Sequence, residues 1–127
     1  MRKVLSLLLS ICIILGSGIN KKSYANTNNV QSAWLTTAWS LDWPKTKNNS
    51  TAQKNELIKI LDTLKDTGIN TVMFQVRPYG DAMYKSSINP WSKELTGTQG
   101  KEPGYIPLAF IIQEAHTRGM KEHAWLN

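Results

Sequence analysis

Residues 70–84, NTVMFQVRPYGDAMY, decide the fold of this chain, because a strand-forming apolar run leads directly into polar and aromatic residues. Side chains alternate along a strand, so one face of the expected strand carries Val72, Phe74 and Val76. Gln75 and Arg77 fall on the opposite face, at the carboxyl end. Parallel α/β folds place their ligand sites outside that end of the strands. The stretch therefore predicts a core strand whose last polar side chains form the floor of a pocket.

The segments before this strand predict a first strand and a helix. Residues 32–39 are rich in Trp, Leu and Thr, which favours a strand. Ser50, with Gln53 three residues later, fits a capping box, and the apolar residues that follow recur at helical spacing. These apolar residues are Leu57, Ile60, Leu61 and Leu64. Gly68 is a typical helix stop before the strand expected at 70–76.

The remainder of the chain repeats the order of helix and strand. Residues 77–106 form a long connection with several Pro and Gly residues, a kind of segment that is usually functional or disordered. Pro107 suits the first turn of a second helix. The apolar face of that helix carries Leu108, Ile111, Ile112 and Ala115. Gly119 ends the helix, and residues 120–127 form a third strand.

The β-α-β-α-β order favours an α/β fold with parallel strands covered by helices. Two architectures fit this order: the opening of a (β/α)8 barrel, and a small doubly wound sheet. A TIM barrel needs roughly 250 residues. In the first architecture, residues 32–127 are therefore the N-terminal part of a truncated TIM (β/α)8 barrel, with its first three strands and two helices. This is the fold class that we expect.

The start of the chain predicts export. Residues 1–25 have a basic start, an apolar run at 4–15 and small residues before Ala25, which is the pattern of a signal peptide cleaved near Ala25. The apolar run is shorter than the roughly 20 residues that a membrane-spanning helix needs, so we expect no stable membrane span after cleavage. Residues 26–31 are polar and are expected to form a flexible arm. We therefore expect a secreted or cell-envelope protein.

Removing the signal peptide changes the composition. Cys12, the single cysteine, lies in the apolar run, so the mature chain would have no disulfide and no thiolate metal site. The basic residues that leave with the signal are Arg2, Lys3, Lys21 and Lys22. This leaves 11 of the 15 basic residues against 9 acidic ones, a net charge of +2. Nucleic-acid binding needs clustered basic residues, and nucleic acid is not an expected partner.

Each strand ends in aromatic or hydrogen-bonding residues that suit a sugar. The first ends at Trp39, the second at Gln75 and Arg77, and the third carries His123, Trp125 and Asn127. Aromatic rings cover the apolar faces of sugars, while polar groups satisfy hydroxyls, which is the usual composition of a site for an oriented polar ligand. No cofactor is indicated.

Several of these residues also have a purely structural interpretation. Arg77 could pair with Asp81 or Asp42, and Trp91 could anchor its loop instead of contacting a substrate. His123 is more often a hydrogen-bonded core histidine than a metal ligand, and we expect no metal. Trp34 and Trp43 are interpreted as packing residues, and His116 as an exposed helix residue.

Four long stretches of the sequence resemble the glycosyl-hydrolase-like 10 family. They are AWLTTAWSLDWP (33–44), INTVMFQVRPYGDAMY (69–84), PWSKELTGTQGKEPGYIPLAF (90–110) and EAHTRGMKEHAWLN (114–127). The family comprises exported bacterial proteins with a TIM-barrel domain similar to glycosidases. Ile106 departs from the pattern, because an Asp is expected there as the cap before Pro107; its absence weakens the helix start by about 1 kcal/mol.

The resemblance implies a carbohydrate substrate in the cell envelope and a barrel whose later strands carry more of the active site. The motif residues that it transfers to this chain as substrate-binding candidates are Asp42, Gln75, Arg77, Asp81, Tyr84, Trp91, His123, Trp125 and Asn127. Trp39 joins them through its place at the end of the first strand.

The function that we expect is the N-terminal portion of an exported glycoside hydrolase-like protein acting on a polysaccharide. Such enzymes use two carboxyl groups that flank the scissile bond, and related barrels place these groups on the fourth and seventh strands. The catalytic residues are therefore unknown, and none of Asp42, Asp81, Glu94 and Glu102 is assigned. The alternatives are a carbohydrate-binding barrel without catalysis and an inactive truncated fragment. The sequence does not indicate an oligomeric state.

Overall fold

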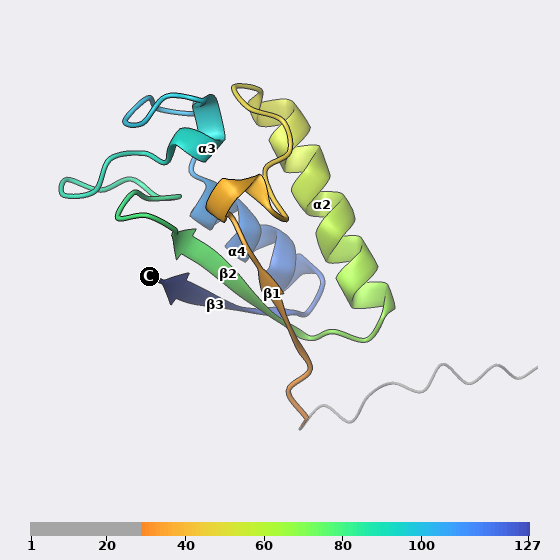
Figure 1. Cartoon of the computed structure of the whole chain (residues 1–127). Coiled ribbons are helices and arrows are strands. Elements are labelled where there is room, and N and C mark those ends of the chain that lie inside the picture. The colour runs from red at the N-terminus through yellow and green to blue at the C-terminus, as the bar shows by residue number, and fades with distance from the viewer. Residues whose placement is uncertain (1–28) are drawn as a thin grey trace, which may run out of the picture.

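A parallel sheet of three strands organises residues 29–127, which are the residues that this computed structural model describes (Figure 1). The strands β1 (Ser32–Leu35), β2 (Thr71–Arg77) and β3 (Lys121–Leu126) follow the order β1-β2-β3. Trp34, Met73 and His123 stand at one register position across the sheet. The expected mixed α/β fold is confirmed. The predicted signal peptide at 1–25 lies outside the described residues.

Helices α2 (Ser50–Asp66) and α4 (Pro107–Thr117) connect the strands and pack on the same face of the sheet. Leu57 and Leu61 of α2 and Ile111 and Ala115 of α4 are fully buried, as their spacing predicts. On the strands these side chains meet a core that contains Leu35, Val72, Phe74 and Val76. The alternation predicted for the second strand is therefore confirmed.

The start of α2 corrects one expectation. Asn49, not Ser50, is the N-cap, and its Oδ1 accepts a hydrogen bond from the backbone N–H of Ala52 at 3.0 Å. Ser50 is already inside the helix, so the expected capping box between Ser50 and Gln53 is wrong. Gln53 is buried instead, and its Nε2 donates to the Leu95 carbonyl at 2.7 Å. The second helix begins as predicted, with Ile106 providing no side-chain cap.

The long connection between β2 and α4 contains a short helix, α3 (Lys93–Thr96). Ser92 caps it, and Gly97 ends it in a left-handed conformation with φ 85°. A bridge between Ala82 and Trp91 closes the loop that precedes α3. The connection is therefore held in place over the carboxyl ends of the strands, beside the 3₁₀ helix η1 (Ala38–Ser40) in Figure 1.

The first strand is shorter than the sequence predicts, because β1 ends at Leu35 and not at Trp39. Side chains capture the backbone N–H groups that would otherwise continue the strand. Asp42 Oδ2 accepts from Thr36 N at 2.7 Å, and Gln75 Oε1 accepts from Thr37 N at 2.9 Å. The chain turns at this point, and the predicted alternation does not extend from Leu35 to Trp39.

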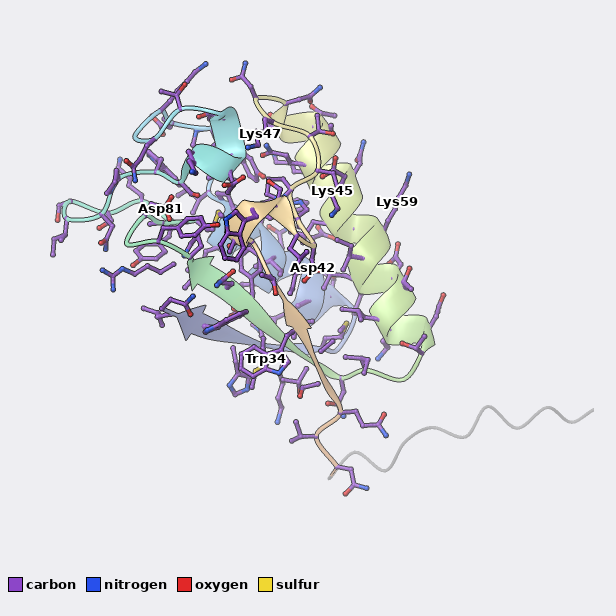
Figure 2. The ribbon with its side chains drawn as sticks, viewed as in Figure 1. Trp34, Asp42, Lys45, Lys47, Lys59 and Asp81 are labelled. Carbon is purple, nitrogen blue, oxygen red and sulfur yellow. The ribbon has the colours of Figure 1, made fainter. Side chains whose placement is uncertain are left out.

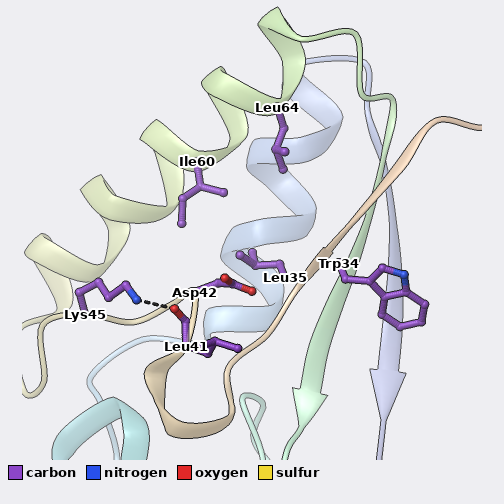
Figure 3. Close-up of a pocket in the computed structure, with 7 residues that line it drawn as sticks. All are labelled: Trp34, Leu35, Leu41, Asp42, Lys45, Ile60 and Leu64. Atoms are coloured by element: carbon purple, nitrogen blue, oxygen red, sulfur yellow. Dashed lines mark hydrogen bonds between the residues drawn. The ribbon is translucent and has the colours of Figure 1, made fainter.

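The second face of the sheet carries large side chains that no described helix covers. Trp34 is 60% exposed, and its indole packs edge-on against Trp125 with ring centroids 4.9 Å apart. Figures 2 and 3 show Trp34 on the side of the strand that points away from α2. His123, at the same register position as Trp34, is also exposed. Within the described residues, the fold thus has one packed face and one open face.

Candidate functional site

Aromatic and charged side chains meet at the carboxyl ends of β1 and β2. This group, which we call the carboxyl-edge cluster, consists of Trp39, Ser40, Tyr79, Asp81 and Glu94. Trp39 is 78% exposed, and its ring lies edge-on to Tyr79 with centroids 5.6 Å apart. The backbone N–H of Trp39 donates to the Tyr79 hydroxyl oxygen at 2.8 Å. The cluster therefore presents two partly exposed aromatic rings in a fixed relation.

Gln75 supports this cluster from below. Its side chain is buried, and Oε1 accepts hydrogen bonds from the backbone N–H groups of Thr37 and Ala38, both at 2.9 Å. The Gln75 carbonyl accepts another from the Thr37 hydroxyl at 2.8 Å. The amide oxygen of Gln75 is therefore engaged in holding the turn that leads to Trp39.

Arg77 and Asp81 each carry a buried polar atom without a hydrogen-bond partner among residues 29–127: Nε of Arg77 and Oδ2 of Asp81. Asp81 is 1% exposed, and its other oxygen, Oδ1, accepts from Tyr79 N at 3.2 Å. Within the described residues no ion pair joins Arg77 to Asp81 or to Asp42. Unsatisfied buried polar groups are costly, and these two lie where ligands bind in parallel α/β folds.

Glu94 is the buried carboxylate of the cluster. It lies in α3, and its Oε2 accepts from the Ser40 hydroxyl at 2.8 Å and pairs with Lys47 Nζ at 3.0 Å. Burial alone raises the pKa of a carboxyl group. Here the hydrogen bonds from Ser40 and Lys47, with the charges of Lys47 and Lys93, outweigh burial and lower the pKa of Glu94 below 4.5. Glu94 is therefore ionised at neutral pH.

Tyr79 has the opposite shift. Desolvation raises the pKa of its hydroxyl above 10.0, the hydrogen bond from the Trp39 backbone N–H lowers it, and the carboxylates of Glu94 and Asp81 raise it further. The phenol is therefore neutral at physiological pH. Its oxygen accepts from Trp39, which leaves the O–H free to donate. Lys93 Nζ lies 5.6 Å from the centre of the ring.

The other predicted site residues lie outside the carboxyl-edge cluster. Trp125 and His123 are on the open sheet face, where Trp125 is the register partner of Gln75. Asn127 is exposed, and its backbone N–H donates to the Arg77 carbonyl at 3.1 Å.

Tyr84 and Trp91 are partly buried and pack against the hydrophobic core. The structure thus brings Trp39, Gln75 and Asp81 together at the carboxyl edge. It places Tyr84 and Trp91 in the long connection, where they pack against the core.

Asp42 belongs to a separate cavity of about 320 Å³ between β1 and α2 (Figure 3). The cavity is lined by Trp34, Leu35, Leu41, Asp42, Lys45, Ile60 and Leu64, and no residue of the carboxyl-edge cluster lines it. Lys45 Nζ donates to the Leu41 carbonyl across its rim. Asp42 itself caps the end of β1 through Thr36.

Ser40 and Tyr79 are members of the cluster that the sequence did not single out, and Glu94 was considered only as an unassigned carboxylate. One signal for Glu94 was available, because Ser92 followed by Gly97 predicts a short capped helix that carries Glu94 in its first turn. The contact between Glu94 and Ser40 spans 54 positions of sequence, which no local pattern predicts.

The arrangement is suited to a polyhydroxylated ligand. Exposed indole and phenol rings bind apolar faces, while a phenol O–H, a guanidinium and carboxylate oxygens bind hydroxyls. Among residues 29–127 no group of three or more His, Cys, Asp or Glu side chains is placed to hold a metal ion. No helix of this part of the chain is long and apolar enough to cross a membrane.

Comparison with known proteins gives consistent matches. The sequence pattern of the family described as glycosyl hydrolase-like 10 matches residues 29–127. Glycosyl hydrolase YngK of Bacillus subtilis (strain 168) is 46% identical over 99 residues, which are 77% of this chain and 19% of the relative. Glycosyl hydrolase DigH of Escherichia coli (strain K12) is 49% identical over 102 residues, 74% of this chain and 23% of the relative. The chain thus spans about a fifth of the length of these curated relatives.

Proposed function

Because this chain belongs to the glycosyl hydrolase-like 10 family, we propose that it forms the N-terminal part of the barrel of an exported glycoside hydrolase. Its substrate would be a polysaccharide of the bacterial cell envelope. In this proposal, residues 29–127 supply substrate-binding groups at the mouth of the barrel. Cleavage of the predicted signal peptide near Ala25 would release the protein outside the cytoplasm.

The observation that carries the proposal is the exposed aromatic pair of Trp39 and Tyr79 at the carboxyl edge of the sheet. The exposed indole of Trp39 is free to contact a ligand, and its backbone N–H is held by the neighbouring Tyr79 hydroxyl. The buried Oδ2 of Asp81 and Nε of Arg77 have no hydrogen-bond partners among the described residues. Arg77 is the last residue of β2, and Asp81 follows it in the next loop. Sugar hydroxyls are suitable partners for both atoms.

Two features support a barrel over a doubly wound sheet. The strands follow the sequence order, and both connecting helices lie on one face, whereas doubly wound sheets carry helices on both faces. The other face carries the Trp34–Trp125 pair, which would become part of the barrel interior. The greater length of the matched relatives leaves room for the remaining strands.

The catalytic carboxyl groups are proposed to lie outside residues 29–127. Glu94 is held by Ser40 and Lys47, and Asp42 by the Thr36 backbone N–H, so both carboxylates already have structural partners. A general acid needs a raised pKa, whereas the pKa of Glu94 is lowered. The described segment therefore contributes binding, and the acid and base or nucleophile come from later strands.

The test uses the full-length protein, purified after removal of the signal peptide. It is incubated with bacterial cell-wall glycan and, separately, with cellulose, chitin and starch, and released reducing sugar is measured. We expect release from the cell-wall glycan and a loss of at least tenfold in Trp39→Ala. Ile88→Ala, an exposed apolar residue in another loop, is the matched control and should retain activity. Absence of sugar release from all four polysaccharides would contradict the hydrolase.

The second candidate is a carbohydrate-binding barrel without catalysis, favoured by the structural engagement of the Asp42 and Glu94 carboxylates. Pull-down with insoluble cell-wall glycan separates the two. Retention on the glycan that depends on Trp39, without sugar release, would support binding alone.

A further inference from the structure

We propose that Glu94 is a positioning residue for Trp39: its carboxylate fixes the turn at Ser40, so that the indole is held as a sugar-stacking surface. This inference rests on the proposed function, because it assumes that Trp39 contacts a saccharide. The proposal gives Glu94 a role through its hydrogen bond with Ser40, a residue 54 positions away in the sequence.

The turn that carries Trp39 has an unusual backbone. Trp39 and the following Ser40 both adopt left-handed conformations, with φ values of 54° and 53°. Left-handed backbone is uncommon for residues other than Gly, and for a bulky aromatic residue it persists only where the surroundings enforce it. The exposed position of Trp39 therefore depends on the contacts that hold this turn.

Those contacts divide into two halves. Before the turn, Gln75 Oε1 holds the Ala38 N–H at 2.9 Å and the Tyr79 hydroxyl holds the Trp39 N–H at 2.8 Å. After it, the Ser40 hydroxyl donates to Glu94 Oε2 at 2.8 Å, its one side-chain contact among residues 29–127. The backbone of this half has contacts of its own, because Ser40 N donates to the Thr37 carbonyl at 3.1 Å and Lys45 Nζ donates to the Ser40 carbonyl at 3.0 Å. Removing the carboxylate therefore removes the side-chain anchor of Ser40 and leaves these backbone contacts and the first half in place.

Glu94 is itself a firm anchor. It is 3% exposed, lies in the first turn of α3, and its backbone N–H donates to the Ser92 hydroxyl at 3.3 Å. Lys47 pairs with the same oxygen that binds Ser40. A charge-assisted hydrogen bond to a buried carboxylate is stronger than a neutral one. Glutamine at this position keeps the shape and an oxygen that can accept from Ser40, but it loses the charge that strengthens this hydrogen bond and the ion pair with Lys47.

A readout without sugar tests the positioning directly. The full-length protein is labelled with 5-fluorotryptophan, and the ¹⁹F resonance of Trp39 is assigned from its loss in Trp39→Phe. We expect Glu94→Gln to shift or broaden the Trp39 resonance and to leave that of the buried Trp43 unchanged. Glu102→Gln is the matched control, because Glu102 is exposed and makes no side-chain hydrogen bond or ion pair among the described residues.

Binding then shows whether the effect acts through Trp39. Affinity for soluble oligosaccharides from bacterial cell-wall glycan is measured for the wild type, Glu94→Gln, Trp39→Ala and the double variant. We expect Glu94→Gln to weaken binding by about fivefold and to cause no further loss in the Trp39→Ala background, as residues that act together do. Additive losses would overturn positioning and identify Glu94 as an independent contact.

The outcomes for the two proposals are distinguishable. If Trp39→Ala binds as the wild type does, the proposed sugar surface is wrong, and the role of Glu94 in sugar binding fails with it. If Trp39→Ala weakens binding but Glu94→Gln changes neither the Trp39 resonance nor affinity, the sugar surface stands and positioning by Glu94 is wrong. Ser40→Ala removes the donor and leaves the carboxylate, and it should reproduce the resonance change of Glu94→Gln.

Discussion

Replacing Gln75 with leucine is the sharpest test of how this fold builds its site. Gln75 is 1% exposed, and its Oε1 accepts the backbone N–H groups of Thr37 and Ala38, each at 2.9 Å. Leucine fills a similar volume but offers no acceptor. Because Thr37 is 0% and Ala38 5% exposed, water cannot readily replace the lost oxygen. The substitution therefore leaves two buried donors unsatisfied.

The expected loss follows from these two donors. A buried N–H group left without an acceptor costs about 1–3 kcal/mol, so Gln75→Leu should lower the free energy of unfolding by about 2–6 kcal/mol. Urea unfolding followed by tryptophan fluorescence measures this loss as a lower midpoint at an unchanged slope. Gln113→Leu, an exposed glutamine on α4, is the matched control. It should change stability by less than about 0.5 kcal/mol.

Hydrogen exchange locates the effect. The amides of Thr37 and Ala38 should lose protection in Gln75→Leu, while the amides in the middle of α2 keep it at low urea concentration. The reasoning would be refuted by a loss below about 1 kcal/mol with both amides still protected. That result would mean that other groups satisfy the turn, and that Gln75 is free to bind a ligand.

Three further predictions follow from other contacts. Because Asn49 is the N-cap of α2, Asn49→Ala should lower the free energy of unfolding by about 1 kcal/mol, and Ser50→Ala by much less, in thermal or urea unfolding. Equal losses in the two variants would show that Ser50 also caps the helix. The lowered pKa of Glu94 contributes stability that is fully present above pH 4.5 and is lost as the pH falls through the folded-state pKa. When the free energy of unfolding is measured between pH 6 and 3, it should therefore fall less steeply in Glu94→Gln than in the wild type. Burial raises the pKa of Glu122, whose Oε1 has no partner among residues 29–127. Glu122→Gln should therefore raise the free energy of unfolding at pH 7, and this gain in stability should disappear below pH 4.5. A lower free energy of unfolding at pH 7 would show that the carboxylate has a favourable partner.

Local patterns were sufficient for the regular elements of the fold. The apolar face of α2 and the alternating core face of β2 were visible, because each is a periodicity of neighbouring residues. Gly68 and Pro107 marked helix ends for equally local reasons. The sequence also predicted that the polar ends of the strands would meet. These features depend on backbone geometry alone and need no knowledge of distant contacts.

The turn after β1 could not be predicted, because distant side chains determine it. Residues 36–39 favour a strand by composition, yet Gln75, 38 positions from Thr37, takes the N–H groups of the turn. Glu94 then fixes Ser40 from a helix of four residues. Both partners are ordinary polar residues in sequence. Their effect arises only when packing brings them to the carboxyl edge, where a buried acceptor outweighs local strand preference.

This turn also changes how the end of β2 is interpreted. In sequence, Gln75 and Arg77 share one face and were expected to line a pocket together. Gln75 is committed to the backbone of the turn, whereas Arg77 Nε and Asp81 Oδ2 remain without partners among residues 29–127. Buried groups in stable proteins are almost always hydrogen-bonded to protein, ordered water or a ligand, and a sugar hydroxyl at this edge would be a suitable partner for both atoms. Supporting and binding roles are therefore divided at the end of β2. Gln75 holds the turn that carries the exposed Trp39, and Arg77, with Asp81 in the loop that follows, is left with polar atoms that can bind a ligand.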